Sequence, residues 1–141
     1  MLGTRAALLQ ADGNIVDTDG ITPLSFEGLS ADNYYIAVHH RNHLSVMSLN
    51  TIALSDSPAT LDFRTASTYG TDAQKEINGN KALWSGDASP NGSINAADRS
   101  ETWNNRNQTG YLNADCDLDG NVNASDRSST WNHRNTAAQL P

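Results

Sequence analysis

The sequence lacks the cysteine pairs, long apolar runs and signal-peptide pattern by which a small disulfide-bonded or membrane-anchored protein is identified. It has a single cysteine among 141 residues, so no internal disulfide can form. No apolar run approaches the roughly 18 residues of a membrane-spanning helix, and the opening residues Met1–Arg5 have no signal-peptide pattern. If the protein is exported, we expect its signal to lie on a longer precursor.

Basic residues are also scarce. The chain has 9 Lys and Arg against 16 Asp and Glu, a net charge of −7. Neither half carries the basic stripe that nucleic acid or an anionic membrane requires. Hydrophobic residues make up only 37%, and abundant Asn, Asp, Ser and Thr indicate many turns around a modest core. We therefore expect no nucleic-acid partner and no membrane insertion.

Residues 1–66 consist of short apolar segments separated by turn residues. The pair Asp12-Gly13 is typical of a tight hairpin turn, and no helical period links the segments, which predicts an antiparallel β-sandwich or barrel. A polar connector over 67–81 follows, in which Asp72–Ile77 is compatible with a short helix capped by Asp72. The expected strands are Arg5–Gln10, Ile15–Val16, Ile21–Phe26, Tyr34–Arg41, Leu44–Leu49, Ile52–Leu54 and Thr60–Phe63.

The part over 82–141 is organised around a duplicated twelve-residue loop. Residues 115–126 (DCDLDGNVNASD) place carboxylates at positions one, three, five and twelve and glycine at position six, which is the pattern of a calcium loop. Ca²⁺ takes about six to eight oxygen ligands at about 2.3–2.6 Å, and this spacing brings alternate side chains to one point. Residues 87–98 (DASPNGSINAAD) repeat the pattern 28 residues earlier. The duplication favours a pair of calcium sites over two Asp/Asn/Gly turns that only resemble them.

Each loop is followed by a predicted helix of about ten residues with one tryptophan. Ala96, Arg99, Ser100 and Trp103 fall at i, i+3, i+4 and i+7 and so share one face, and the second helix repeats this arrangement. We expect the tryptophans to form the core of this unit, with arginines stacked at its rim. The alternative is a partner-binding surface formed by Trp103, Arg106, Trp131 and Arg134.

Other reactive residues point to no catalytic site. Cys116 holds the second position of its loop, so its side chain should point away from the metal, and we expect a small exposed residue. His39 and His40 would lie on opposite faces of a strand and could not chelate one ion, so we expect solvent-facing imidazoles at a strand end for these two and His43. The chain has no nucleophile elbow, phosphate-binding glycine loop or zinc spacing. We therefore expect no enzyme.

The duplicated loop and helix, with Asp at position twelve and no helix entering the loop, resembles the paired F-hand of type I dockerins. That resemblance implies one Ca²⁺ in each loop, two antiparallel helices, and ligation by side chains at positions one, three, five and twelve, by the position-seven carbonyl, and through water at position nine. The implied ligands are Asp87, Ser89, Asn91, Ser93, Asn95 and Asp98 in the first loop and Asp115, Asp117, Asp119, Asn121, Asn123 and Asp126 in the second.

The four ligand positions hold two carboxylates in the first loop and four in the second, so we expect the second site to bind calcium more tightly and to fill first. The chain from residue 82 onward has few large apolar side chains, which predicts a structural role for the metal.

The segment Leu24–Val38 resembles the hairpin of transthyretin-like and Cna-B-type β-sandwiches. The whole chain is similar to the C-terminal part of large bacterial secreted or surface proteins, in which such a sandwich precedes a dockerin-like unit. In those proteins further strands precede the segment that corresponds to Arg5–Gln10. The expected fold is therefore α+β in two parts, with an incomplete sandwich that has one unpaired edge.

These observations favour a non-catalytic, calcium-binding structural or assembly module of a larger exported protein, located outside the cell or at its surface. Two alternatives stay open. A dockerin would bind a cohesin-like partner, although the helices have few of the Leu, Ile and Lys residues that dockerins carry. An unpaired sheet edge would instead favour self-association into a filament or surface layer.

Overall fold

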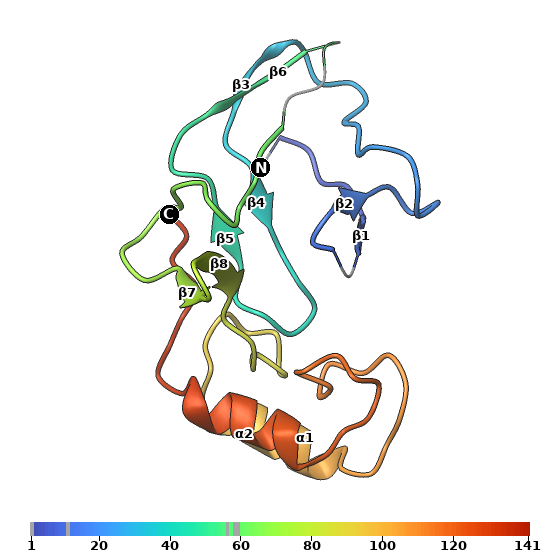
Figure 1. Cartoon of the computed structure of the whole chain (residues 1–141), viewed down its shortest axis with the longest axis vertical. Helices are drawn as coiled ribbons and strands as arrows, with labels where there is room; N and C mark the ends of the chain where they lie inside the picture. Colours follow the sequence, from blue (N-terminus) through green and yellow to red (C-terminus); the bar gives the residue numbers. More distant parts are fainter. Residues whose placement is uncertain (1, 11, 56, 58–59) are drawn as a thin grey trace.

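The computed structural model describes all residues except 1, 11, 56, 58 and 59. It is a mixed α and β structure, as expected, in which short antiparallel strands occupy one end and two helices lie side by side at the other (Figure 1). The elements are β1 (Leu8–Leu9), β2 (Ile15–Val16), β3 (Asp32–Tyr34), β4 (Ala37–Val38), β5 (Val46–Met47), β6 (Ile52–Leu54), β7 (Gln74–Ile77), β8 (Asn80–Leu83), α1 (Ala96–Asn104) and α2 (Ala124–Asn132).

The described strands form four two-stranded sheets, β1 with β2, β3 with β6, β4 with β5, and β7 with β8. The turn predicted at Asp12-Gly13 joins β1 to β2, which confirms that hairpin. The long strand expected over Tyr34–Arg41 is divided between β3 and β4, because Ile36 contacts Ser48 across an irregular step of the ladder. Residues 32–54 thus form one interrupted hairpin.

A sandwich of two packed sheets is not confirmed by this arrangement. The strands have two to four residues each, and those of β1 are about half exposed, with Leu8 at 47% and Leu9 at 50%. Among the described residues before Trp84, the buried apolar side chains are Val16, Leu44, Val46 and Ala73. So little apolar area leaves short hairpins held mainly by their backbone hydrogen bonds.

The helix considered for Asp72–Ile77 is wrong, because Gln74–Ile77 is strand β7. It pairs with β8 through the turn Asn78-Gly79, whose φ angles are 52° and 80°. Asn-Gly favours this left-handed turn, so the local signal for a hairpin was present. Asp72 does not cap a helix. Its carbonyl accepts a hydrogen bond from Nε1 of Trp84.

The buried residues after Trp84 repeat with the period of the sequence. Every described buried position of the first loop and helix has a buried counterpart 28 residues later, although the side chains differ in type. The same backbone path therefore recurs twice. The buried pairs are Gly86 and Ala114, Asp87 and Asp115, Ala88 and Cys116, Ile94 and Val122, Asp98 and Asp126, and Thr102 and Thr130.

The two helices confirm the positions predicted from the sequence but not the buried face. Trp103 and Trp131 are each 51% exposed, so the expected tryptophan core is wrong. Each helix instead buries its third residue, an aspartate that faces the loop, and the threonine four positions later. Because residues at i and i+4 share a face, the loop carboxylate fixes which side of the helix is buried.

The segment after α2 returns to the strands, as Figure 1 shows. The side chain of Gln139 accepts a hydrogen bond from the backbone N–H of Thr71 (2.6 Å). The ends of the helical part are therefore tied to the strand part. Within the described residues, neither helix is long or apolar enough to cross a membrane.

Candidate metal centre

The first residue of each loop is a buried aspartate that closes the loop on itself. Asp87 accepts hydrogen bonds from the backbone N–H groups of the fifth and sixth loop residues, both at 2.9 Å. Asp115 accepts the equivalent bonds at 3.1 and 3.2 Å. The sixth residues, Gly92 and Gly120, have φ of 80° and 85°, which explains why glycine stands there.

The twelfth residue of each loop is fully buried and joins the loop to its helix. Oδ1 of Asp98 accepts the backbone N–H of the third residue at 2.9 Å, and Oδ1 of Asp126 does so at 3.2 Å. Oδ2 accepts the N–H of the ninth residue, Asn95 or Asn123, at 2.7 and 2.8 Å. The side chains of these asparagines in turn cap the helices. Each helix thus begins at the edge of its loop with a complete capping box.

The two loops are interlocked through the segments that follow the helices. Ile94, at position eight of the first loop, exchanges 2.8 Å backbone hydrogen bonds with residues 135 and 136, which follow α2. Val122, at position eight of the second loop, exchanges bonds of 2.8 and 2.9 Å with residues 107 and 108, which follow α1. Each loop is therefore completed by the other repeat, and the two repeats form one unit.

The second loop brings three carboxylates together. Oxygen atoms of Asp115, Asp117 and Asp126 lie within 4.8 Å of one another, which is close enough for all three to hold one metal ion. Burial, followed by the charge of Asp126, raises the pKa of the Asp117 carboxyl above its ordinary value. A divalent cation at this point would offset the repulsion among these groups. Asp119 accepts the backbone N–H of Asn121 at 2.7 Å, on the same loop but outside this trio.

The first loop brings its predicted ligands together with fewer charges. Nδ2 of Asn91 donates to Oγ of Ser89 at 2.8 Å, and that hydroxyl donates to Oδ1 of Asp98 at 2.7 Å. Positions three, five and twelve therefore converge. Burial is the main cause that raises the pKa of Asp87, and the charge of Asp98 adds to it. The donor set is oxygen throughout, which suits a hard cation such as Ca²⁺.

The remaining predicted ligands lie along the outer turns of the loops. The carbonyl of Ser93 accepts Nδ2 of Asn95 at 3.1 Å. The side chain of Asn121 donates to the Asp119 carbonyl at 3.3 Å. Asn95 and Asn123 use their side-chain oxygens to cap the helices, at 2.8 Å from the N–H of Ala97 and Ser125.

The expectation of an exposed Cys116 is wrong. Its side chain is 1% exposed and fills the position that Ala88 fills in the first repeat. Burial, with the nearby charge of Asp126, raises the pKa of this thiol to about 12. The residue therefore acts as a small apolar core residue.

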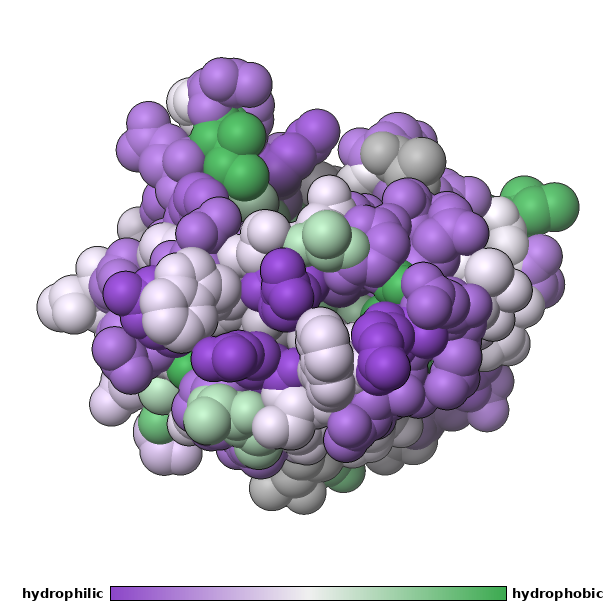
Figure 2. Space-filling model, turned by 90° about the horizontal axis from the view of Figure 1, so that it is seen from below, coloured by the Kyte–Doolittle hydropathy of each residue, from purple (hydrophilic) through white to green (hydrophobic). Residues whose placement is uncertain are grey.

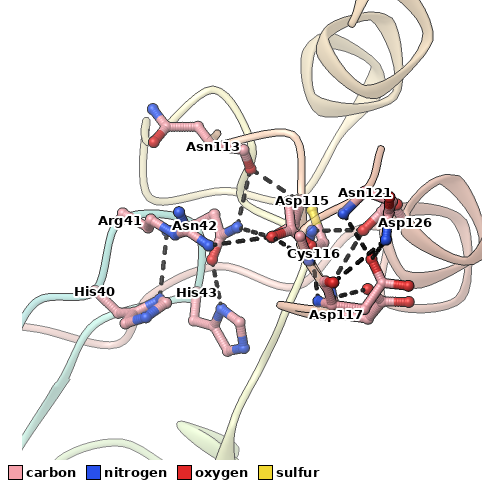
Figure 3. Close-up of polar contacts among 12 residues, drawn as sticks. His40, Arg41, Asn42, His43, Asn113, Asp115, Cys116, Asp117, Asn121 and Asp126 are labelled. Carbon is pink, nitrogen blue, oxygen red and sulfur yellow. Dashed lines mark hydrogen bonds and ion pairs between the residues drawn. The ribbon is translucent and has the colours of Figure 1, made fainter. Parts of the chain in front are cut away.

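A turn from the strand part clamps both loops. The backbone carbonyl of Asn42 accepts the N–H groups of Gly86 (3.1 Å) and Asp87 (3.0 Å) at the start of the first loop. Its side-chain Nδ2 donates to the carbonyl oxygens of Asn113 (3.0 Å) and Asp115 at the start of the second (Figure 3). Asn42 is fully buried, and no spacing in the sequence indicates this contact across more than 70 residues.

The histidines beside Asn42 are not all solvent-facing, which corrects the expectation for two of them. His40 and His43 are partly buried and lie edge to face with ring centroids 4.5 Å apart. Burial, with the charge of His40 as the next cause, lowers the pKa of His43 to about 3, so its ring is neutral at neutral pH. Nδ1 of His43 lies 2.8 Å from Oδ1 of Asn42 and orients that amide toward the second loop. His39 is exposed, as expected.

Arg41 reaches the second loop from the same turn. Its Nη2 lies 3.4 Å from Oδ2 of Asp115, and its guanidinium stacks 3.8 Å from the ring centre of Tyr111. Its Nε and Nη1 atoms are buried without a hydrogen-bond partner. A fixed positive charge thus stands beside the carboxylate cluster, which no loop pattern could have predicted.

The predicted partner surface is exposed. All four residues are solvent-exposed, and they form two stacked pairs, Arg106 on Trp103 and Arg134 on Trp131. Comparison of the chain with protein-family models, curated proteins and solved structures finds no match.

Proposed function

We propose that the chain is a non-catalytic, calcium-stabilised structural module with a dockerin-like organisation, and that each loop binds one Ca²⁺. The observation that carries this proposal is the repetition of the carboxylate contacts at positions one and twelve in both loops. Each loop buries the aspartates at its first and twelfth positions, four in all, and burying a charged carboxylate costs free energy unless a cation or hydrogen bonds compensate it. Metal ions explain that burial, because they offset the cost of desolvating these charges.

Calcium is the favoured ion because the ligand positions of the loops offer a mixed set of neutral and charged oxygens. Mg²⁺ requires a near-ideal octahedron and keeps several waters. The ligand count also orders the two sites, since the second loop has four carboxylates at the ligand positions and the first has two. We infer that the second site binds more tightly.

The ions are structural in this proposal. Apolar residues in the buried set from 82 onward are small or few, with Ile94 and Val122 as the largest. With dissociation constants of about 10⁻⁴ M and millimolar calcium, each ion would stabilise the fold by on the order of 1–3 kcal/mol. Such concentrations exist outside the cell, which supports an extracellular or surface location.

The test is calcium titration by calorimetry, combined with circular dichroism and thermal melting before and after chelation. We expect two binding steps and a large loss of helicity without metal. Asp126→Asn should remove the tighter step and Asp98→Asn the weaker one. Glu76→Gln, which removes an exposed carboxylate on β7, should change neither. Unchanged helicity and melting temperature after complete metal removal would refute the structural role.

A second candidate function is docking to a protein partner through the helix pair, as in a cohesin-binding dockerin. The exposure of Trp103 and Trp131, each 51%, favours it. Large aromatic side chains are enriched where proteins bind one another. This candidate is compatible with structural calcium, because the ions would hold the two helices in place.

A further inference from the structure

Four arginines surround the two exposed tryptophans in a reciprocal arrangement. Arg106, just after α1, stacks on Trp103 with its Cζ 4.5 Å from the ring centre, and Arg134, just after α2, stacks on Trp131 at 4.3 Å. The opposite helix supplies a second arginine to each indole, Arg127 to Trp103 at 6.0 Å and Arg99 to Trp131 at 5.8 Å. We call these six residues the Arg-Trp face.

The Arg-Trp face is exposed and continuous. All six side chains are solvent-exposed, and Figure 2, which views the helix end from below, shows strongly hydrophilic side chains alternating with near-neutral ones. A cleft of about 230 Å³ opens in it, where Arg99 and Arg134 flank Trp131 beside the start of α1. The residues 28 positions away, Arg127 and Arg106, flank Trp103 in the same way.

The stacking decides what kind of group can bind. Trp103 and Trp131 are each 51% exposed and each has a guanidinium stacked on its ring, so a group that approaches either indole also meets arginine N–H donors. The N–H groups of a guanidinium lie in one plane. Arg106, which follows α1, and Arg134, which follows α2, each donate through Nη1 to the backbone carbonyl of the tryptophan on which they stack, at 3.0 and 2.7 Å. The remaining donors form a fixed fork that matches a carboxylate.

The four arginines of the Arg-Trp face form no ion pair with the acidic residues that the structure describes. Within the described residues, no Asp or Glu oxygen lies within 4.0 Å of any of these four guanidinium groups. They are also the only Lys or Arg residues from Trp84 to the last residue of the sequence. Although the chain has a net charge of −7, all the basic residues of its C-terminal part therefore belong to the Arg-Trp face. Unpaired arginines beside aromatic rings are typical of protein contact surfaces.

We propose that the Arg-Trp face binds an acidic segment of a partner polypeptide, whose Asp and Glu side chains pair with Arg99, Arg106, Arg127 and Arg134. An anionic membrane fits less well, because the helices place Ser, Asn and Thr beside the tryptophans rather than apolar residues that could insert. The inference rests on the proposed function, since the calcium loops orient the helices that carry the face.

Binding is tested with the full chain in saturating calcium and a labelled glutamate-rich peptide, by fluorescence anisotropy. The matched probe has glutamine at every glutamate. We expect binding of the glutamate peptide only, with an affinity that falls as salt is raised. Calcium titration and circular dichroism on the same sample report the proposed function separately, so a folded, calcium-loaded protein that ignores the peptide overturns this inference alone.

Variants localise the site. Arg106→Glu combined with Arg134→Glu should weaken peptide binding by about a hundredfold, while Arg106→Lys with Arg134→Lys should weaken it about tenfold, because lysine keeps the charge but loses the planar fork. Arg64→Glu, an exposed arginine paired with Asp62 in the strand part, is the matched control and should bind normally. Equal binding by the wild type and the double glutamate variant would overturn the proposal. Preference for heparin or for anionic vesicles over the glutamate peptide would also overturn it, in favour of a polysaccharide or a membrane surface.

Discussion

Nη2 of Arg41 lies 3.4 Å from Oδ2 of Asp115, at the first position of the second loop. The arginine side chain is 13% exposed and stacks on Tyr111. Its charge therefore acts on the carboxylate cluster with little screening by water. The first loop has no such neighbour among its described contacts, since Asn42 meets its start through a backbone carbonyl.

Replacing Arg41 should tighten calcium binding at the second site. Arg41→Gln removes a positive charge that opposes the cation, and we expect an affinity gain of about tenfold, measured by competition with a calcium-sensitive dye. Arg41→Lys keeps the charge and serves as the control, with affinity close to wild type. A weaker second site in a folded Arg41→Gln protein would show that this arginine instead helps to form the loop.

Removing the clamp at Asn42 should destabilise the calcium-loaded protein. Asn42→Ala deletes buried hydrogen bonds to two carbonyls and leaves His43 without its partner. We expect a loss of about 2–4 kcal/mol in the free energy of unfolding, measured with denaturant in saturating calcium. Asn50→Ala, at an exposed position, should lose less than about 0.5 kcal/mol.

The interlocked loops should depend on the apolar side chains at position eight. Ile94 is fully buried, so Ile94→Ala should cost about 2–5 kcal/mol, because it opens a cavity between the first loop and the segment after α2. Ile21→Ala removes the same atoms from a residue that is 84% exposed and should cost less than about 0.5 kcal/mol. Thermal melting of both variants makes the comparison.

Stability without calcium should respond to pH through Asp117. Its folded pKa is raised above 3.8, mainly by burial and then by Asp126, so the metal-free folded state holds the proton more tightly than the unfolded state. Stability from this group therefore falls as pH rises from 3.8 through the raised pKa. In chelator at neutral pH, Asp117→Asn should retain more helicity than the wild type, as measured by circular dichroism, and should lose that advantage once the pH is below 3.8.

Calcium should reverse the effect of the same substitution. In saturating calcium the wild type should melt higher than Asp117→Asn, because the carboxylate then acts as a ligand. A variant that is less stable than wild type in both chelator and calcium would contradict carboxylate crowding as the cost of the metal-free loop.

Patterns close in sequence predicted the helical part well. The spacing of Asp and Gly in residues 87–98 and 115–126 indicated the loops, and both helices follow where the repeat placed them. These features depend on local geometry, in which a carboxylate reaches N–H groups a few residues away. The Asp12-Gly13 hairpin was predictable for the same reason.

The tryptophan positions could not be assigned by hydrophobicity alone. On helices that are otherwise polar, Trp103 and Trp131 are the natural candidates for a core. The buried face is instead set by Asp98 and Asp126, which must face their loops, and Thr102 and Thr130 follow them at i+4. Tracing the helix face from the ligand would have predicted this result.

Contacts over long sequence separations left no signal at all. Asn42 meets residues 86, 87, 113 and 115 only because the chain folds back, and no local pattern distinguishes it from other turn asparagines. The predicted sandwich is not confirmed for a related reason. Alternating apolar residues predict strands, but packing two sheets needs more apolar area than Val16, Leu44 and Val46 supply.

Each repeat supplies a segment that pairs with the loop of the other repeat, so the helical part resembles a segment-exchanged dimer whose two subunits are joined in one chain. The half that ends at Gly110 holds the piece that completes Val122, and the half that begins at Tyr111 holds the piece that completes Ile94. Neither half can close its own ladder. Cutting the chain between Gly110 and Tyr111 should therefore yield two fragments that reassemble with each other.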